Sequence, residues 1–196
     1  MTAFAAAVFF LLITPGPGVL TTAGVGSGFG YRSGLRFLAG LFVGTNLVAI
    51  AVVSGLAAIV FSVPEIRTVL LWASVGFFVY LAARIALSGA RIGFIEQAAA
   101  PGFMNGVLLQ FINPKAYAVN STLFFGYAFL PDDLQWEIIL KFLIINAIWI
   151  PVHLIWLWAG VSLKQLNLSP VIQRGINFAM AASLLAVVGL AAWSQL

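Results

Sequence analysis

The chain has 196 residues, of which 63% are apolar and only 7% are charged, whereas a soluble domain carries about 25% charged residues. This composition, with a mean hydropathy of +1.12, excludes water as the main solvent of the protein. The absence of cysteine excludes disulfides, thiol redox chemistry and thiolate metal sites. The net charge is +4, but the basic residues are scattered at the ends of apolar stretches, so we expect no nucleic-acid partner.

Six apolar stretches follow one another along the chain, each long enough to cross a bilayer, which takes about 20 residues. No charged residue precedes Arg32, so the first stretch lacks the basic start of a cleavable signal and we expect it to be retained. The separators do not resemble interdomain linkers. The sequence therefore predicts an all-α integral membrane protein, a bundle of six transmembrane helices forming a single domain over 1–196. The stretches cover residues 3–25, 36–61, 66–88, 104–129, 138–162 and 172–194.

Basic residues gather on one side of this predicted bundle. If all six stretches cross, six Lys and Arg residues lie at or near the first, third and fifth loops, and only Arg67 and Lys141 lie on the other side. Because Lys and Arg near helix ends stay in the cytoplasm, we expect a multi-pass protein of the bacterial inner (plasma) membrane with both termini outside. A re-entrant first stretch would change this topology. The six residues are Arg32, Arg36, Arg84, Arg91, Lys164 and Arg174.

The first stretch contains two prolines and two glycines within Ile13-Thr14-Pro15-Gly16-Pro17-Gly18. Prolines remove backbone donors and clash with the preceding turn, and glycines weaken the helix further. Unpaired backbone groups inside a membrane cost several kcal/mol unless they are buried in protein or face a water-filled cavity. The segment therefore predicts a broken helix at a binding cavity, with a simple proline kink as the alternative.

The fourth stretch has a second break, at Pro114-Lys115. A charged lysine at the membrane centre costs about 3 kcal/mol, so we expect Lys115 to face the bundle interior or a cavity. Four polar residues recur along one face of this helix, either as solute ligands or as hydrogen-bonding partners of other helices. They are Gln110, Asn113, Tyr117 and Asn120.

The two breaks occupy matching places in the two halves of the chain, about 1–95 and 96–196. Pro15 matches Pro114, and Asn46 in the second stretch matches Asn146 in the fifth. Three helices per half would invert the second half, so the breaks would meet near the membrane midplane. Interrupted segments in corresponding halves are typical of a transporter site. The sequence thus predicts two inverted three-helix repeats with broken first and fourth helices.

Four motifs follow one another along the chain, namely Thr14-Pro-Gly-Pro17, Gly40-Leu-Phe-Val-Gly44, Gly76-Phe-Phe-Val-Tyr-Leu81 and Asn113-Pro-Lys115. In this order they resemble the LysE/RhtB family of amino-acid exporters. The Leu109-Gln110-Phe111 segment is most similar to the cysteine/O-acetylserine exporter branch. This resemblance implies a six-helix inner-membrane protein that exports amino acids by secondary transport against proton entry.

The chain departs from the family pattern at Thr45-Asn46, where many relatives have an aspartate. All five of its carboxylates fall in or beside predicted loops, so a proton relay through a buried carboxylate is unsupported. His153 is the remaining proton-coupling candidate, because imidazole ordinarily titrates near neutral pH. Its position on one face with Trp149 and Trp156 also fits a neutral packing histidine.

We therefore expect a secondary transporter that exports small neutral amino acids or derivatives, of the cysteine, O-acetylserine, homoserine or threonine type. The alternative is a membrane channel or a structural membrane subunit. An enzyme is not expected, because no span holds a nucleophile with a base or a His/carboxylate cluster. The expected partners are the solute and the lipid bilayer, with self-association left open and no cofactor or metal. The substrate-binding candidates are Thr14, Pro15, Gly16, Pro17, Asn46, Gln110, Asn113, Pro114, Lys115, Tyr117 and Asn120.

Overall fold

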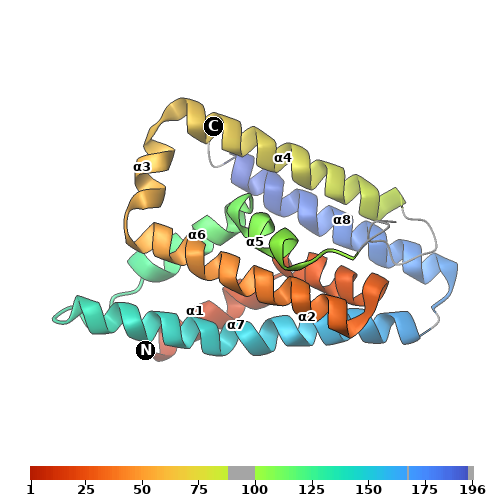
Figure 1. The fold of residues 1–196 in the computed structure, drawn as a ribbon, viewed down its shortest axis with the longest axis horizontal. Helices are drawn as coiled ribbons and strands as arrows, with labels where there is room; N and C mark the ends of the chain where they lie inside the picture. The colour runs from red at the N-terminus through yellow and green to blue at the C-terminus, as the bar shows by residue number, and fades with distance from the viewer. Residues whose placement is uncertain (88–99, 167, 194–196) are drawn as a thin grey trace.

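The computed structural model describes residues 1–87, 100–166 and 168–193. Within these ranges the regular secondary structure is entirely α-helical, as the composition predicts (Figure 1). The predicted boundary between the halves, with Arg91 and Glu96, lies outside the described residues. The helices are α1 (Thr2–Ile13), α2 (Pro17–Val53), α3 (Leu56–Ser62), α4 (Pro64–Leu87), α5 (Phe103–Phe111), α6 (Pro114–Phe125), α7 (Leu134–Gln165) and α8 (Pro170–Trp193).

Both predicted helix breaks are confirmed. α1 ends at Ile13 and α2 begins at Pro17, and in the second half α5 ends at Phe111 and α6 begins at Pro114. In each case proline is the first residue of the new helix, where its missing N–H would have had no intrahelical partner. The proline chemistry therefore sets where each helix restarts.

The polar segment over residues 32–36, which the sequence suggests as a separator between the first two apolar stretches, is instead helical. The chain turns at Gly30, whose φ of 80° and ψ of 179° are open only to glycine, and helix resumes at once. Cβ atoms built on Gly26 and Gly34 would both touch Leu157, so the segments flanking the turn lie side by side against α7. A single glycine thus folds α2 into a hairpin, with a first half over 17–29 and a second half over 31–53.

The second predicted stretch, 36–61, also ends earlier than expected. α2 stops at Val53, and a left-handed Gly55 with φ 76° redirects the chain into the short helix α3. Figure 1 shows α3 linking α2 to α4, which lies beside α8. Glycine is the one residue for which this backbone conformation carries no steric penalty.

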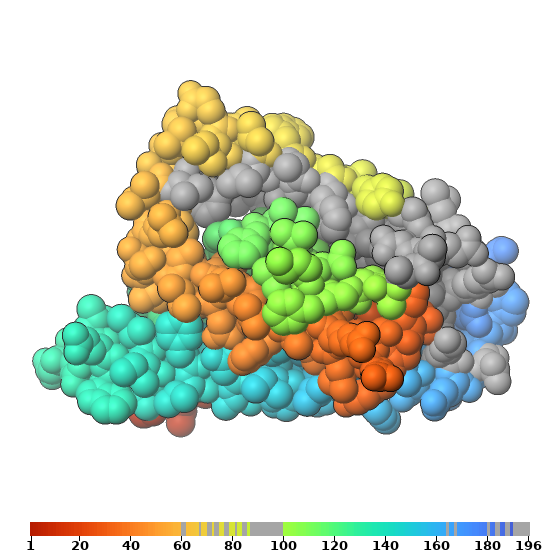
Figure 2. All heavy atoms as spheres, in the orientation of Figure 1, coloured from red at the N-terminus to blue at the C-terminus, as the bar shows by residue number. Residues whose placement is uncertain are grey.

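Glycines also let α2 and α5 approach closely. A Cβ on Gly40 would lie 1.8 Å from the Phe103 carbonyl oxygen, and one on Gly106 would lie 2.3 Å from the Phe37 carbonyl oxygen. Figure 2 shows α5 lying across α2. Small residues at such crossings are typical of helices that pack inside membranes, where close backbone contact replaces the hydrophobic driving force.

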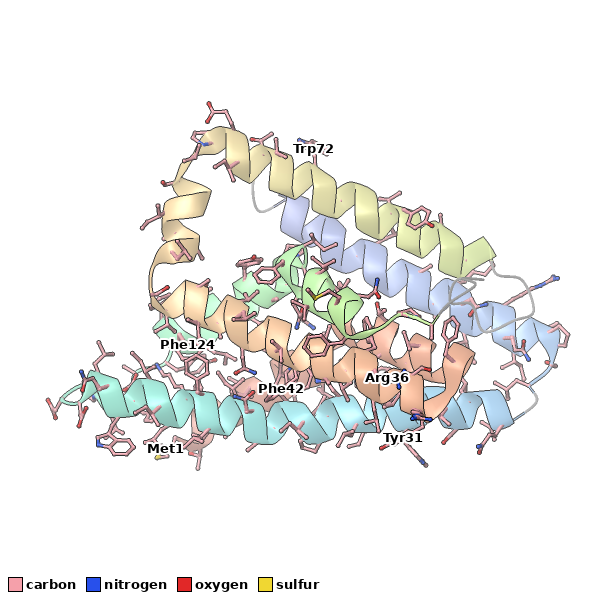
Figure 3. The ribbon with its side chains drawn as sticks, viewed as in Figure 1. Met1, Tyr31, Arg36, Phe42, Trp72 and Phe124 are labelled. Atoms are coloured by element: carbon pink, nitrogen blue, oxygen red, sulfur yellow. The ribbon has the colours of Figure 1, made fainter. Side chains whose placement is uncertain are left out.

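Apolar side chains form the contact between α2 and α7. Phe42 of α2 packs on Trp149 of α7 with ring centroids 5.4 Å apart, and Figure 3 shows Phe42 between the two helices. Leu41 and Leu157 are buried in the same cluster. By contrast, Trp72 on α4 points away from the bundle and is exposed.

Within the described residues, α2 and the segment Leu134–Leu163 of α7 are the helices long and apolar enough to cross a membrane. Large apolar side chains such as Phe10, Trp72, Phe125 and Trp158 are exposed, which marks a surface suited to lipid or to a partner. The length and apolar composition of α2 and of this segment of α7 weakly indicate a membrane location.

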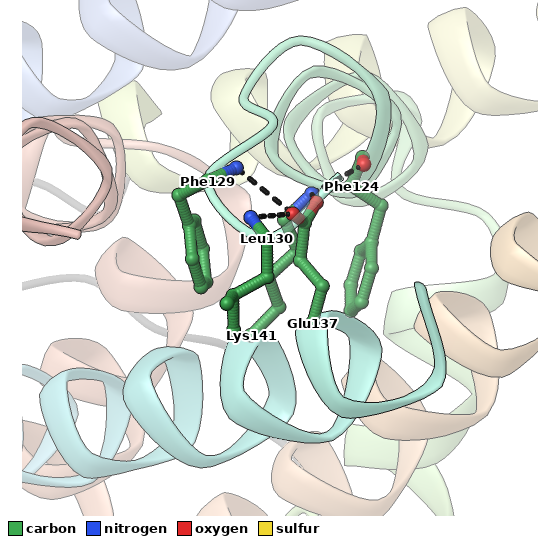
Figure 4. A network of polar contacts seen from close by, with 5 residues as sticks. All are labelled: Phe124, Phe129, Leu130, Glu137 and Lys141. Carbon is green, nitrogen blue, oxygen red and sulfur yellow. Dashed lines mark hydrogen bonds and ion pairs between the residues drawn. The ribbon is translucent and has the colours of Figure 1, made fainter. Parts of the chain in front are cut away.

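At the start of α7 the structure buries an ion pair that the sequence places beside a loop. Lys141 Nζ lies 2.7 Å from Glu137 Oε1 and donates to the Phe124 carbonyl oxygen at 2.8 Å (Figure 4). Glu137 Oε2 accepts from the backbone N–H groups of Phe129 and Leu130. The exposed fractions of Glu137 and Lys141 are only 3% and 2%. This cluster, which we call the loop anchor, fixes residues 126–133 to α7.

Candidate functional site

The two helix breaks lie against each other. Lys115 Nζ, in the first turn of α6, donates to the Thr14 carbonyl oxygen at the end of α1 at 2.6 Å. A Cβ built on Gly16 would lie only 2.8 Å from Lys115 Cδ and 3.0 Å from its Nζ. Glycine at position 16 therefore makes room for the lysine side chain, and the ammonium group takes up a carbonyl that the break leaves without an intrahelical partner.

The residues before Pro114 position this lysine. Asn113 caps α6, because its Oδ1 accepts from the Lys115 backbone N–H at 3.1 Å. Its Nδ2 donates to Gln110 Oε1 at 2.9 Å, which ties the end of α5 to the start of α6. The Tyr117 hydroxyl donates back to the Phe111 carbonyl oxygen at 3.0 Å. The break at 112–113 is thus held by hydrogen bonds between its own residues and those of the two flanking helices.

The N-terminus of α2 differs from that of α6. Gly16 precedes the helix and provides no side-chain cap, and Pro17 is the first helical residue. The backbone N–H groups of Gly18 and Val19 lie in the first turn, where an α-helix offers no intrahelical acceptor. A helix N-terminus of this kind favours an anion.

The two breaks line one cavity of about 50 Å³, which has room for about three or four water-sized groups. Its polar lining comes from both breaks and from the middle of α7, and its apolar lining comes from α1, α6 and α7. The lining residues are Leu11, Leu12, Thr14, Gly16, Gly18, Val19, Thr45, Gln110, Asn113, Lys115, Ala116, Val119, Asn120, Leu123, Ile145, Trp149 and His153.

His153 is fixed in orientation at the edge of this cavity. Its ring stacks on Trp149 with centroids 3.7 Å apart and planes 15° apart, and its Nδ1 lies 2.9 Å from the Trp149 carbonyl oxygen. Its exposed fraction is only 4%. A Cβ built on Gly18 would lie 3.9 Å from Nε2, so Nε2 faces the uncapped start of α2.

The cavity combines one positive charge with neutral donors and acceptors. Lys115 is its charged residue, and no aspartate or glutamate of the described ranges lines it. An ammonium group has three N–H donors, and Thr14 takes one of those of Lys115. Asn120 uses its Nδ2 to donate to the Ala116 carbonyl oxygen, which leaves its Oδ1 as an acceptor at the cavity wall. The arrangement can hold a small solute that carries a carboxylate and also donates hydrogen bonds.

Most of the candidates from the sequence gather at this cavity. Seven of them line it, namely Thr14, Gly16, Gln110, Asn113, Lys115, Asn120 and His153. Pro15, Pro17, Pro114 and Tyr117 shape the breaks but do not line the cavity described here.

Asn46 occupies a different place from these seven. Its Nδ2 donates to Asn146 Oδ1 at 3.1 Å, and Asn146 Nδ2 donates back to Asn46 Oδ1 at 2.9 Å. This reciprocal pair joins α2 to α7. The neighbouring Thr45 lines the cavity instead. The sequence analysis did not select Thr45, although a polar residue inside an apolar span could have indicated it.

The apolar wall could not be predicted as part of the site. Leu11, Val119, Leu123 and Ile145 line the cavity, but in the sequence they resemble the other aliphatic residues of their spans. Only the packing of α1 against α6 and α7 selects them.

A scan of protein-family models and searches of the curated proteins and of the solved structures find no match to this chain.

Proposed function

We propose that this chain is a secondary transporter that exports small neutral amino acids or their derivatives across the bacterial inner membrane. The observation that carries the proposal is the cavity between the two helix breaks, where the Lys115 ammonium meets neutral acceptors without a lining carboxylate of the described ranges. The resemblance of the Thr14-Pro-Gly-Pro17 and Asn113-Pro-Lys115 motifs to LysE/RhtB exporters supports the same function.

A zwitterion fits the two kinds of polar group in the cavity. Its carboxylate would bind Lys115 Nζ and the uncapped start of α2, where the helix dipole adds to the attraction. Its ammonium group would donate to neutral acceptors such as Asn120 Oδ1 and the remaining lone pair of the Thr14 carbonyl. Asn46 and Asn113, which the sequence also suggested as substrate-binding residues, have their side-chain oxygens occupied by other donors.

The size and lining of the cavity favour a small solute. A volume of about 50 Å³ has room for about three or four water-sized groups, so the cavity has to widen to hold even the smallest solute of this class. The aliphatic wall from Leu11, Val119, Leu123 and Ile145 suits a short, uncharged side chain. A charged side chain on the solute would lose its hydration there without an ionic partner.

For the transport cycle we propose six membrane spans in two inverted halves, with both termini outside. The contacts between matching segments support this arrangement. α2 packs against α7, and α4 packs against α8. The Asn46–Asn146 pair joins residues 100 positions apart, and the Thr14–Lys115 bond joins residues 101 positions apart. Rocking of one half against the other would expose the cavity to each side in turn.

A channel or structural subunit is the rival function, and one contact favours it. In such a protein Lys115 would only neutralise the end of α1, as its bond to the Thr14 carbonyl oxygen allows. The prolines would then bend helices without forming a solute site.

Reconstituted vesicles distinguish these functions. Purified protein is placed in vesicles loaded with a panel of labelled amino acids, including cysteine, O-acetylserine, homoserine and threonine. We expect saturable efflux of at least one of them, with accumulation against its gradient when a proton gradient is imposed. Flux that rises linearly with concentration would indicate a channel. Flux equal to that of protein-free vesicles for every solute would refute transport of this class.

A further inference from the structure

We propose that the solute inserts between Lys115 and Thr14, so that each pole of the zwitterion replaces one partner of the hydrogen bond that joins these two residues. The inference rests on the proposed function of the cavity and deepens it, because it says where the solute binds and which helix makes room. In the structure Lys115 Nζ donates directly to the Thr14 carbonyl oxygen at 2.6 Å. This direct bond is the closed form of the site.

The two groups of this bond match the two poles of an amino acid. A carboxylate carries a full negative charge, so it is a stronger partner for the Lys115 ammonium group than a neutral carbonyl oxygen. The Thr14 carbonyl oxygen can only accept, and the solute ammonium group supplies the donor that it loses. The exchange of partners therefore leaves neither buried group without a hydrogen bond, which would be costly.

The closed cavity is too small to take a solute beside the intact bond. Its volume of about 50 Å³ has room for about three or four water-sized groups, and an amino acid has more non-hydrogen atoms than that. Part of the wall has to move outward when the solute binds. Leu11, Leu12 and Thr14 line the cavity from the C-terminal end of α1. Displacement of this end therefore widens the cavity directly.

The end of α1 is the part of the wall with the fewest polar attachments. Among the described residues, the bond between Lys115 and Thr14 is the one hydrogen bond that ties this end to another helix. By contrast, two side-chain bonds of Asn113 hold the break between α5 and α6. The reciprocal pair of Asn46 and Asn146 joins α2 to α7. Loss of a single bond thus frees the end of α1 and leaves the other walls in place.

The start of α1 is held more firmly and forms the pivot. Phe4 is buried, and its ring contacts the rings of Tyr127 and Phe129 in the segment that the loop anchor fixes to α7. Two turns later, Phe10 is exposed. α1 and α2 are separate helices across residues 14–16, so the end of α1 can tilt without bending α2.

A bridging solute sets the size of this tilt. With a hydrogen bond of about 2.8 Å at each pole and the backbone of one amino acid between them, Lys115 Nζ and the Thr14 oxygen come to lie roughly 6–8 Å apart. The present separation is 2.6 Å. The end of α1 therefore moves away from α6 by a few ångström.

The distance between two spin labels measures this movement in the purified protein in detergent. The chain has no cysteine, so a pair of introduced cysteines is labelled specifically. Phe10→Cys places a label near the end of α1, and Ala118→Cys places one on α6, both at exposed positions. The probe is the solute of the cysteine, O-acetylserine, homoserine and threonine panel that binds most tightly. We expect it to lengthen the distance between these labels by a few ångström.

A second label pair distinguishes this tilt from rocking of the halves. Ile50→Cys, at an exposed position of α2, replaces Phe10→Cys and is paired with the same label at Ala118→Cys. Rocking moves α1 and α2 together, whereas insertion moves only the end of α1. We expect the solute to leave the distance from α2 to α6 unchanged.

Analogues with one pole test the exchange of partners on the unlabelled wild-type protein. The amine that lacks the carboxylate leaves Lys115 without an acceptor if it inserts. The acid that lacks the amino group leaves the Thr14 carbonyl oxygen without a donor. An unpaired buried group costs about tenfold or more in affinity. We expect each analogue to bind at least about tenfold more weakly than the amino acid, and neither to lengthen the distance from α1 to α6.

Gly16→Ala breaks the closed bond without removing its charge. The added Cβ would lie 2.8 Å from Lys115 Cδ and 3.0 Å from its Nζ, so the flexible lysine has to leave the Thr14 carbonyl oxygen. We expect the distance from α1 to α6 to lengthen or to broaden before any solute is added. Gly175→Ala, where a built Cβ has no described atom within 4 Å, is the matched control and should keep the wild-type distance.

The failures of the two proposals can be told apart. If no solute of the panel binds to the wild-type protein, the proposed function is wrong. If a solute binds but the distance from α1 to α6 does not change, or if both label distances lengthen equally, the insertion is wrong and the transporter function stands. A wild-type distance in Gly16→Ala, or an analogue that binds as tightly as the amino acid, would also overturn the insertion. Because the analogues are compared on the wild-type protein, the test remains decisive if a variant does not fold.

Discussion

The close crossing of α2 and α5 at Gly40 predicts a large loss of stability in Gly40→Ala. The new methyl group would lie 1.8 Å from the Phe103 carbonyl oxygen and 2.7 Å from the Phe103 carbonyl carbon. These are backbone atoms, so the contact is relieved only by moving α5 as a whole. Forcing an added carbon into a packed interface costs about 1–3 kcal/mol, and more where the neighbours are rigid.

Helix propensity opposes this loss and allows a matched control. Alanine is about 1 kcal/mol more favourable than glycine inside a helix. At Gly40 the clash is with rigid backbone at the upper end of the range, so we expect a net loss of about 2 kcal/mol. Gly175 in α8 has no described atom within 4 Å of a built Cβ. In Gly175→Ala the propensity term acts alone, and stability should hold or rise by up to about 1 kcal/mol.

Thermal unfolding in detergent, followed by circular dichroism, measures both changes. A loss of about 2 kcal/mol corresponds to a fall in Tm of about 4–8 °C for a chain of this size. Gly175→Ala should unfold at or above the wild-type temperature. If the two variants unfold at the same temperature, α2 and α5 do not cross as closely as the structure shows, and the account of glycine packing is wrong.

Three further predictions concern the proposed transporter. A reporter fused after Leu196 should give a periplasmic signal, because basic residues favour the other side, and a cytoplasmic signal would contradict the six-span count or the orientation. Lys115→Met should insert and fold but lose most export from loaded vesicles, whereas unchanged export would make this lysine a structural residue. Replacing Pro15 and Pro17 together by alanine should let helix continue across the break and hold or raise stability by a few kcal/mol. Transport should fall in the same double variant, and full transport there would make the break a simple kink.

The sequence predicted best those features that depend on local chemistry. Proline lacks the N–H that a helix interior needs, so the breaks at Pro15-Gly16 and before Pro114 could be placed from the residues alone. The cost of burying a cation predicted that Lys115 would face the bundle interior or a cavity, and Lys115 lines the cavity. Its partner, the Thr14 carbonyl oxygen, could not be identified, because any free carbonyl of the bundle would serve.

Features that depend on tertiary packing could not be predicted in the same way. Gly30 is one of several glycines around residues 24–34, and nothing local distinguishes it as the residue that turns α2 back on itself. Asn46 and Asn113 are both polar residues in apolar stretches, so the sequence suggested both as site residues. In the structure Asn46 is hydrogen-bonded to Asn146 of α7 and does not line the cavity. Because Glu137 and Lys141 are charged, the sequence suggested that they lie at the end of a span beside a loop. In the structure both are buried, because they form an ion pair with each other.

The loop anchor has a consequence for the order in which the protein assembles. Lys141 Nζ lies 5.8 Å from the centre of the Phe4 ring and 5.7 Å from that of Phe129, and the two rings contact each other. α1 is made before these partners, which follow roughly 125 residues later, and that takes about 6–25 s at 5–20 residues per second. During that time α1 lacks the surface against which it finally packs. α1 therefore leaves the ribosome well before it can reach its native place, and early proteolysis should cut near Phe4 in nascent chains that stop before α7.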